Sequence, residues 1–512
     1  MASPSTATSR LAPVGAGIVT MALIWWIAGS TLQRVPVVPD EAAYLLQARL
    51  FAHGHWTAAA RPIPEFFEQL YVIVTPFLAS KYPPGQSLML VPGIWLGTPL
   101  LMPILLSGLA GALIFALSRR VAGPWVALLA LLLWLSSYMH VYWRATYMSE
   151  VTTSAFWLLA WWALDRWRQR GATDTRYLVL TAVSVGVVAI TRPFTAVALA
   201  LPVIAVVLWT AWPARRWRPV AIAAAAGTAV VAILPLWNVA STGDWRESPL
   251  ALYTGQYMPF DGPGFGIGTT LPSRRMPPDM ARGTAPFFAL HRDYLPATVP
   301  GALIARLRFI GRDVWESRWY LAPFALGALI VTTAEGWFAL GSLALLVVLY
   351  LLYPHPPFYT IYYQEAEPVL FFLTGLGLVR AAQLLARRRA WMVCAALAVG
   401  GMAMVYPVVK ILRAQDAQDE RFYTRARALF DAAPATRAII FVRYMPTHHD
   451  GLPLIRNEAD LASASRWVVY DRGDADTALM RLAPDRTPYL FDEIRWKLIP
   501  MANSPRVADT TR

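Results

Sequence analysis

The side chains best suited to chemistry lie at the two ends of one polar segment, residues 33–85. Asp40 and Glu41 form a carboxylate pair shortly after an apolar run, and Lys81 opens a Lys-Tyr-Pro-Pro-Gly turn before the next one. Lysine is rare in this chain, which has only Lys410 and Lys497 besides. A compact ammonium group suits a point contact with phosphate. The alternatives are a carboxylate pair that caps a helix and a lysine that extends along the membrane interface.

Other charged residues fall between apolar runs. Arg192, in Thr-Arg-Pro, is either a second phosphate contact or a turn residue. Arg144 and Glu150 flank a short connection, where we expect a structural ion pair or, alternatively, a part of the site. The further candidates for the lining of a sugar pocket are tyrosines and acids at the same end of the runs: Tyr44, Tyr82, Tyr362, Tyr363, Glu365 and Glu367.

The composition predicts a membrane protein. Of the 512 residues, 57% are hydrophobic and 15% are charged, whereas a soluble domain carries about 25% charged residues. Apolar runs of about twenty residues account for the difference. We predict about eleven transmembrane helices. Their expected ranges are 13–32, 101–118, 124–142, 149–166, 176–191, 194–212, 219–238, 319–333, 336–353, 367–386 and 390–409. The run 86–98 is shorter and contains Pro92, which favours a partial or interfacial helix.

Arginine clusters predict the orientation. They lie in alternate loops, at 119–120, 166–170, 215–218 and 387–389. The positive-inside rule places such clusters and the N-terminus in the cytoplasm. The long segments 33–85, 239–318 and 410–512 are then external. Although the net charge is +14, the basic residues form no stripe on one soluble face, so we predict no nucleic-acid partner.

The tail 411–512 has a different pattern. A charged helix at 417–432 is followed by β-type runs at 438–444, 466–470 and 488–491, with a helix at 474–482 between the last two. This order predicts a small external α/β domain with a three-stranded sheet. The expected fold is therefore an all-α polytopic membrane domain over 1–410 with a soluble α/β domain behind it. The single cysteine, Cys394, offers neither a disulfide nor a multi-cysteine metal site.

An acidic pair after the first span, an external Lys-Tyr-Pro-Pro-Gly turn and about a dozen helices resemble the membrane glycosyltransferases of the C superfamily. The most similar branches are the protein O-mannosyltransferases, the lipid A aminoarabinose transferases and the bacterial proteins related to them. The resemblance covers residues 10–410 in topology and residues 39–85 in motif. It implies transfer of a sugar from a polyprenyl-phosphate carrier to a hydroxyl acceptor, with inversion at the anomeric carbon.

The same resemblance implies roles for three residues. Asp40 matches the general base that acts on the acceptor, Glu41 matches its companion acid, and Lys81 matches the position that holds the carrier phosphate. No nucleotide diphosphate leaves in such a reaction, so no cofactor is required. A divalent metal is compatible with the chemistry, but nothing in the sequence supports one.

The leading hypothesis is thus an inverting glycosyltransferase of the bacterial inner membrane. Its partners would be a polyprenyl-phosphate-linked sugar, membrane lipids and an unidentified hydroxyl acceptor on a lipid, a glycan or a protein. The main rival is a transporter or flippase of a lipid-linked solute, which is expected to place broken helices and ionisable groups near the middle of the membrane. A third reading is a non-catalytic component of a cell-envelope assembly that docks through the tail.

Overall fold

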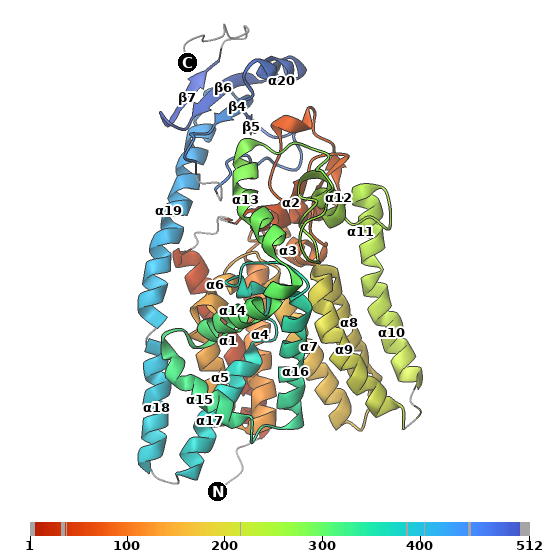
Figure 1. Ribbon diagram of the computed structural model, residues 1–512, viewed down its shortest axis with the longest axis vertical. Coiled ribbons are helices and arrows are strands. Elements are labelled where there is room, and N and C mark those ends of the chain that lie inside the picture. Colours follow the sequence, from red (N-terminus) through yellow and green to blue (C-terminus); the bar gives the residue numbers. More distant parts are fainter. Residues whose placement is uncertain are drawn as a thin grey trace.

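Long helices lie side by side along the longest axis of the molecule, and a small sheet lies at one end (Figure 1). This computed structural model describes the chain from Thr6 to Met501, apart from residues 32–35, 37, 214, 216, 386–387, 404 and 449–451. The helices that follow the long axis are α1 (Thr6–Thr31), α4 (Leu101–Ala122), α5 (Pro124–Leu135), α7 (Glu150–Gln169), α8 (Thr175–Thr191), α9 (Pro193–Ala211), α10 (Trp217–Val231), α11 (Ile233–Thr242), α16 (Ala334–Tyr350), α17 (Pro368–Leu384), α18 (Arg388–Ala403) and α19 (Val405–Asp431).

The apolar helices make this a multi-pass membrane protein. In the described part of the chain, four segments are long and apolar enough to span a membrane: Leu11–Ala28, Leu101–Ala122, Pro193–Ala211 and Trp217–Thr242. A bent pair, Pro124–Leu135 with Tyr138–Arg144, counts as a fifth. The shorter apolar helices are Thr175–Thr191, Ala334–Tyr350, Pro368–Leu384 and Arg389–Gly400. The total of about eleven spans stays a prediction.

Two predicted spans differ from the helices observed. The span 124–142 bends by 72° between α5 and α6 (Tyr138–Arg144). The span 319–333 opens with the 3-10 helix η3 (Glu316–Leu321) and continues as the short helix α15 (Ala322–Ala328). One side chain connects both irregularities, because the buried Arg318 donates to Ser136 Oγ at 2.5 Å and to the carbonyl of Leu133 at 3.0 Å. A buried guanidinium needs such acceptors, and apolar periodicity does not reveal them.

The segments predicted to be external fold between the helices and the sheet. The first contains α2 (Pro39–Ala52), the 3-10 helix η1 (Pro64–Phe66) and the small antiparallel sheet of β1 (Ala58–Ala59), β3 (Phe77–Ser80) and β2 (Val72–Ile73). The predicted partial helix after it is α3 (Gly85–Trp95). The second contains α12 (Pro249–Tyr257), α13 (Pro278–Asp293), the 3-10 helix η2 (Pro296–Thr298) and α14 (Val299–Trp315). The 3-10 helix η4 (Thr360–Tyr362) precedes α17.

The C-terminal sheet has four strands, in the order β5-β4-β6-β7. Strands β4 (Ala438–Arg443), β5 (Arg466–Tyr470) and β6 (Thr487–Asp492) are parallel, and β7 (Lys497–Pro500) adds an antiparallel edge. The 3-10 helix η5 (Gly473–Ala475) and helix α20 (Asp476–Leu482) lie between β5 and β6. The prediction of three strands was wrong because it missed β7, an edge strand that has four residues and ends in proline. Helix α19 runs through position 410, so the membrane part and the sheet share one continuous helix.

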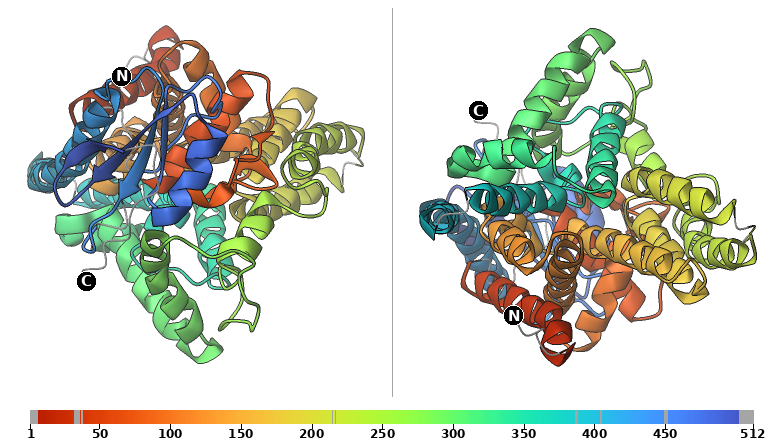
Figure 2. Two further views of the ribbon diagram at one scale, coloured as in Figure 1. Left: turned by 90° about the horizontal axis from the view of Figure 1, so that it is seen from above. Right: turned by 90° about the horizontal axis from the view of Figure 1, so that it is seen from below.

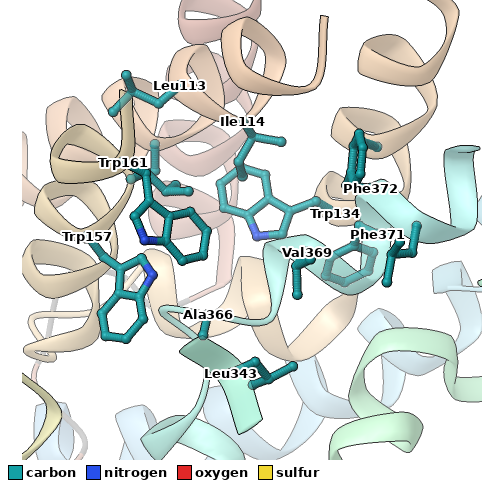
Figure 3. Packing of buried hydrophobic residues seen from close by; sticks show 14 of the residues in the cluster. Leu113, Ile114, Trp134, Trp157, Trp161, Leu343, Ala366, Val369, Phe371 and Phe372 are labelled. Atoms are coloured by element: carbon teal, nitrogen blue, oxygen red, sulfur yellow. The ribbon is translucent and has the colours of Figure 1, made fainter. Parts of the chain in front are cut away.

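The largest apolar core lies among the central helices. Trp134, Trp157, Trp161 and Phe371 are buried there and come from α5, α7 and α17 (Figure 3). Seen from the end opposite the sheet, α18 and α19 form one edge of the helix array and α10 another (Figure 2). Packing of these indole and phenyl rings holds α5, α7 and α17 together, and the candidate site lies beside the ends of these helices.

Candidate active site

Helix α2 begins with Pro39, so Asp40 and Glu41 lie in its first turn. Proline suits the first helical position, and acidic residues are stabilised near the helix N-terminus. Glu41 is buried, and its carboxylate accepts from the backbone N–H groups of Tyr147 at 2.8 Å and Val38 at 3.2 Å. These bonds fix the start of α2 against the segment before α7. Glu41 therefore positions Asp40, and its role as a companion acid in the reaction stays a prediction.

The two ends of the first external segment meet at this helix. The Tyr82 hydroxyl donates to the Asp40 carboxylate, and the ring of Tyr44 packs against that of Tyr82 with centroids 4.7 Å apart. Lys81 is adjacent, with its backbone N–H bonded to the carbonyl of Tyr71 at 3.0 Å. The structure thus joins Asp40, Lys81, Tyr44 and Tyr82 in one place, as the two sequence motifs suggested.

The Lys81 ammonium group is buried inside a cage of tyrosine rings. Its nitrogen lies 4.0 Å from the ring centroid of Tyr71, 5.2 Å from that of Tyr253 and 5.3 Å from that of Tyr82. The nearest carboxylate is that of Asp261, at 3.9 Å. Ring faces attract a cation but do not neutralise it. Because one carboxylate of the described residues lies at that distance, the ammonium keeps positive charge available for an anionic ligand.

Asp261 was missed by the sequence analysis. It lies between α12 and α13, where the Tyr353 hydroxyl donates to its Oδ1 at 2.7 Å and His291 Nε2 lies 3.6 Å from the same oxygen. The surrounding stretch 259–268 is rich in glycine and proline and has no periodicity. Its proximity to Lys81, which is 180 positions away in the chain, arises only in the folded protein.

Arg192 lies between α8 and α9 and holds two acids. Its Nη1 lies 2.7 Å from Glu150 Oε1 and 2.9 Å from Glu365 Oε1, and its guanidinium lies 5.2 Å from the ring centroid of Tyr362. The same nitrogen donates to the carbonyl of Ile361 at 3.1 Å. Arg192 is thus more than a turn residue, because it fastens the segment before α17 to the starts of α7 and α9.

Two cations act on Asp40. Burial raises the pKa of Asp40 above its ordinary value of 3.8, although the hydrogen bond from Tyr82 and the charges of Lys81 and Arg192 oppose the rise. Burial lowers the pKa of Lys81 below its ordinary value of 10.5, against the attraction of Asp261 and Asp40. A carboxylate with a raised pKa is a stronger base, and a base works best when its pKa approaches the working pH.

Two other predicted residues, Arg144 and Glu150, have different surroundings. Glu150 pairs with Arg192, so the expected ion pair with Arg144 does not form. The buried guanidinium of Arg144 has no hydrogen-bond acceptor among the described residues, and it lies 4.8 Å from the ring centroid of Trp134.

Glu367 and Tyr363 each contact a histidine away from Asp40. Glu367 Oε2 lies 2.7 Å from the Nε2 of buried His140, and the Tyr363 hydroxyl bonds to His355 Nε2 at 2.9 Å. Their neighbours Glu365 and Tyr362 are the ones that reach the site. Within the described ranges, no three histidine, cysteine or acidic side chains come together as a metal site requires.

Part of the chain matches a protein family, and its fold resembles solved structures. Residues 97–238 match the family model described as dolichyl-phosphate-mannose-protein mannosyltransferase. No curated protein sequence matches the chain. The fold resembles the crystal structure of ArnT from Cupriavidus metallidurans bound to undecaprenyl phosphate, with a TM-score of 0.57, 14% identity and coverage of 96% of this chain and 94% of ArnT. The same protein in the apo state gives a TM-score of 0.55 and 14% identity over 94% and 89% of the two chains.

The family match lies in the membrane helices, while the likeness of fold extends over nearly the whole chain and includes the C-terminal sheet. The chain is thus similar to the dolichyl-phosphate-mannose-protein mannosyltransferases over residues 97–238, and similar in fold to ArnT.

Proposed function

We propose that the protein is an inverting glycosyltransferase that moves a sugar from a polyprenyl-phosphate carrier to a hydroxyl group. The reaction would take place at the external face of a bacterial inner membrane, with the N-terminus in the cytoplasm. One observation carries the proposal: the half-buried carboxylate of Asp40 accepts from the hydroxyl of Tyr82, whose ring centroid lies 5.3 Å from the ammonium nitrogen of Lys81. A base close to a cation is the combination that such a transfer needs.

The chemistry assigns each group a role. Asp40 takes the proton of the acceptor hydroxyl. The oxygen of that hydroxyl attacks the anomeric carbon from the face opposite the carrier phosphate. The bond between that carbon and the phosphate oxygen breaks, and the electron pair leaves with the polyprenyl phosphate. Negative charge grows on this phosphate, where Lys81 and Arg192 stabilise it because preorganised charges are strongest in a buried site. The leaving group is a lipid phosphate monoester, so the scheme needs no cofactor.

Two similarities support this choice of donor. The matching family is described by a dolichyl-phosphate sugar, and the ArnT structure of similar fold is described as bound to undecaprenyl phosphate. The ammonium group of Lys81 suits the phosphate of either kind of carrier. The acceptor remains open among a lipid, a glycan and a protein.

The test uses purified protein in detergent with a panel of radiolabelled polyprenyl-phosphate sugars. Transfer or release of sugar by the wild type should fall by about 10²- to 10⁴-fold in Asp40→Asn, the usual contribution of a general base. Asp293→Asn is the matched control, because Asp293 is an exposed acid on the external helix α13 that pairs only with the neighbouring Arg292. Equal turnover by wild type and Asp40→Asn, with donor binding intact, would remove Asp40 from the catalytic role.

A further inference from the structure

An apolar pocket lies among the membrane helices, apart from Asp40 and Lys81. It is formed by α4, α7, α9, α16 and α17, and most of its wall is aliphatic or aromatic. Representative wall residues are Ile114, Leu117, Trp161, Val206, Phe338 and Phe372. Figure 3 shows Ile114, Trp161 and Phe372 converging from three of these helices. The proposed reaction has no use for this pocket, since none of the residues that contact Asp40 lines it.

One end of the pocket is polar. Ser118, Asp165, Arg168 and Glu335 line it there, at the ends of α4 and α7 and the start of α16. Both acids have a basic partner, because Arg120 forms an ion pair with Asp165 and another with Glu335 at 3.6 Å. Arg168 is exposed and, within the described part of the chain, forms no ion pair.

The charge around this mouth is positive. Arg119 and Arg120 end α4, and three arginines lie between positions 166 and 170 at the end of α7. This is the end of the molecule opposite the C-terminal sheet (Figure 1). An anionic headgroup at this membrane surface would be attracted by these arginines.

The wall chemistry determines what fills the pocket. An apolar void loses dispersion contacts along its whole lining, and the abundant apolar solute beside membrane helices is a lipid chain. We propose that the pocket binds one acyl chain of an anionic phospholipid from the leaflet at the arginine-rich end, with the lipid phosphate at Arg168. The chain would enter between α7 and α16 and reach the start of α17.

A lipid chain in the pocket would contact the first turn of α17. Pro368 and Val369 line it, and they follow closely after Glu365, which holds Arg192. A bound chain would therefore support the first turn of α17 from the side opposite the ion pair. Bound lipid stabilises the folded state by mass action, so saturation with the anionic lipid should raise the unfolding temperature.

The experiment is native mass spectrometry of delipidated full-length protein, titrated with phosphatidylglycerol or phosphatidylcholine of identical chains. The wild type should retain one phosphatidylglycerol more tightly than phosphatidylcholine. Ala339→Trp fills the pocket and should abolish this binding, whereas Ala344→Trp, at an exposed position of the same helix, should not. If Ala339→Trp does not fold, Val206→Phe fills the pocket from the facing wall of α9.

A second pair of variants tests the headgroup. Arg168→Gln should weaken phosphatidylglycerol binding by about fivefold, as expected for one basic residue near an anionic headgroup, and leave phosphatidylcholine unchanged. Arg166→Gln, in the same exposed turn of α7 but outside the pocket, is the control. Equal retention of both lipids, retention unchanged by Ala339→Trp, or no stoichiometric lipid on the wild type would each overturn the proposal. None of these readouts requires glycosyltransferase activity.

Discussion

At the scale of single residues, Asp40 and Lys81 must carry opposite charges at the same pH. Asp40 acts as a base only when deprotonated, and burial raises its pKa above 3.8. Activity should therefore fall as the pH decreases through this raised pKa. Lys81 stabilises phosphate only when protonated, and burial lowers its pKa below 10.5, so activity should fall again before pH 10.5. A pH profile of kcat should therefore be bell-shaped and narrower than the two ordinary pKa values would give. A flat profile on the alkaline side would contradict the role of Lys81.

Asp261 offers a sharper test of the same pair. Its carboxylate raises the pKa of Lys81, as does that of Asp40. Asp261→Asn removes this support while keeping the acceptor for the Tyr353 hydroxyl, so the alkaline limb of the pH profile should move to lower pH and the acidic limb should change little. Asp293→Asn, which changes an exposed acid paired with Arg292, should leave both limbs in place. An unchanged alkaline limb in Asp261→Asn would show that this carboxylate does not hold the charge on Lys81.

Site residues could be predicted where a short sequence motif marks them. Asp40 and Lys81 stood out because each lies beside an apolar run in a motif of unusual residues. Asp261 and Tyr253 have no such signal because they come from a distant segment, and Tyr71 lies in the same segment as Lys81 but outside either motif. Glu365 and Tyr362 rather than Glu367 and Tyr363 reach Arg192, since the turn η4 before α17 decides which side chains face it. The surroundings of Arg144 could not be predicted from the sequence, because its expected partner Glu150 forms an ion pair with Arg192 instead.

At the scale of elements, Gly85 lets α3 approach the end of α8. A Cβ at position 85 would lie 2.1 Å from Thr191 Oγ1 and 2.9 Å from the carbonyl carbon of Ile190. Because Arg192 follows Thr191 directly, Gly85→Ala should displace Arg192 relative to the Lys81 turn. We expect a loss of about 1–3 kcal/mol of stability, typical of overpacking, together with reduced kcat. Gly341→Ala is the control, with nothing within 4 Å of its added Cβ. A thermal unfolding midpoint equal to that of the control would contradict this close contact.

Helices were predictable where apolar residues decide the conformation, as in α4 and α9. They were not predictable where polar side chains interrupt a span, as Arg318 does at the start of α15 by bonding to the end of α5. The partial helix α3 was expected from its length and Pro92. In the tail, three parallel strands had enough β-branched and aromatic residues to be seen, while β7 is defined mainly by its pairing with β6.

At the scale of the whole molecule, the C-terminal sheet packs against the segment that carries Lys81. Phe66 and Phe67 insert into the core of the sheet, with ring centroids 6.2 Å from Phe441 and 5.6 Å from Trp467 respectively. Polar contacts surround them, since Arg61 donates to the carbonyl of Glu458 at 2.8 Å and Arg472 to that of Glu65 at 2.8 Å. The C-terminal sheet therefore supports the loop that leads to Lys81.

Removal of this support should loosen the active site without altering a residue that touches substrate. Phe66 and Phe67 are only 2% and 3% exposed, and truncation of a buried phenylalanine costs about 3–5 kcal/mol. In the double variant Phe66→Ala/Phe67→Ala, hydrogen exchange should accelerate over residues 58–82 and along β4 and β5, and kcat should fall while the helices keep their protection. Phe77→Ala is the matched control, because Phe77 lies in the same segment but is 38% exposed. Unchanged hydrogen exchange over residues 58–82 in the double variant would mean that the membrane helices alone hold the loop. The contact between the loop and the C-terminal sheet would then not stabilise the site.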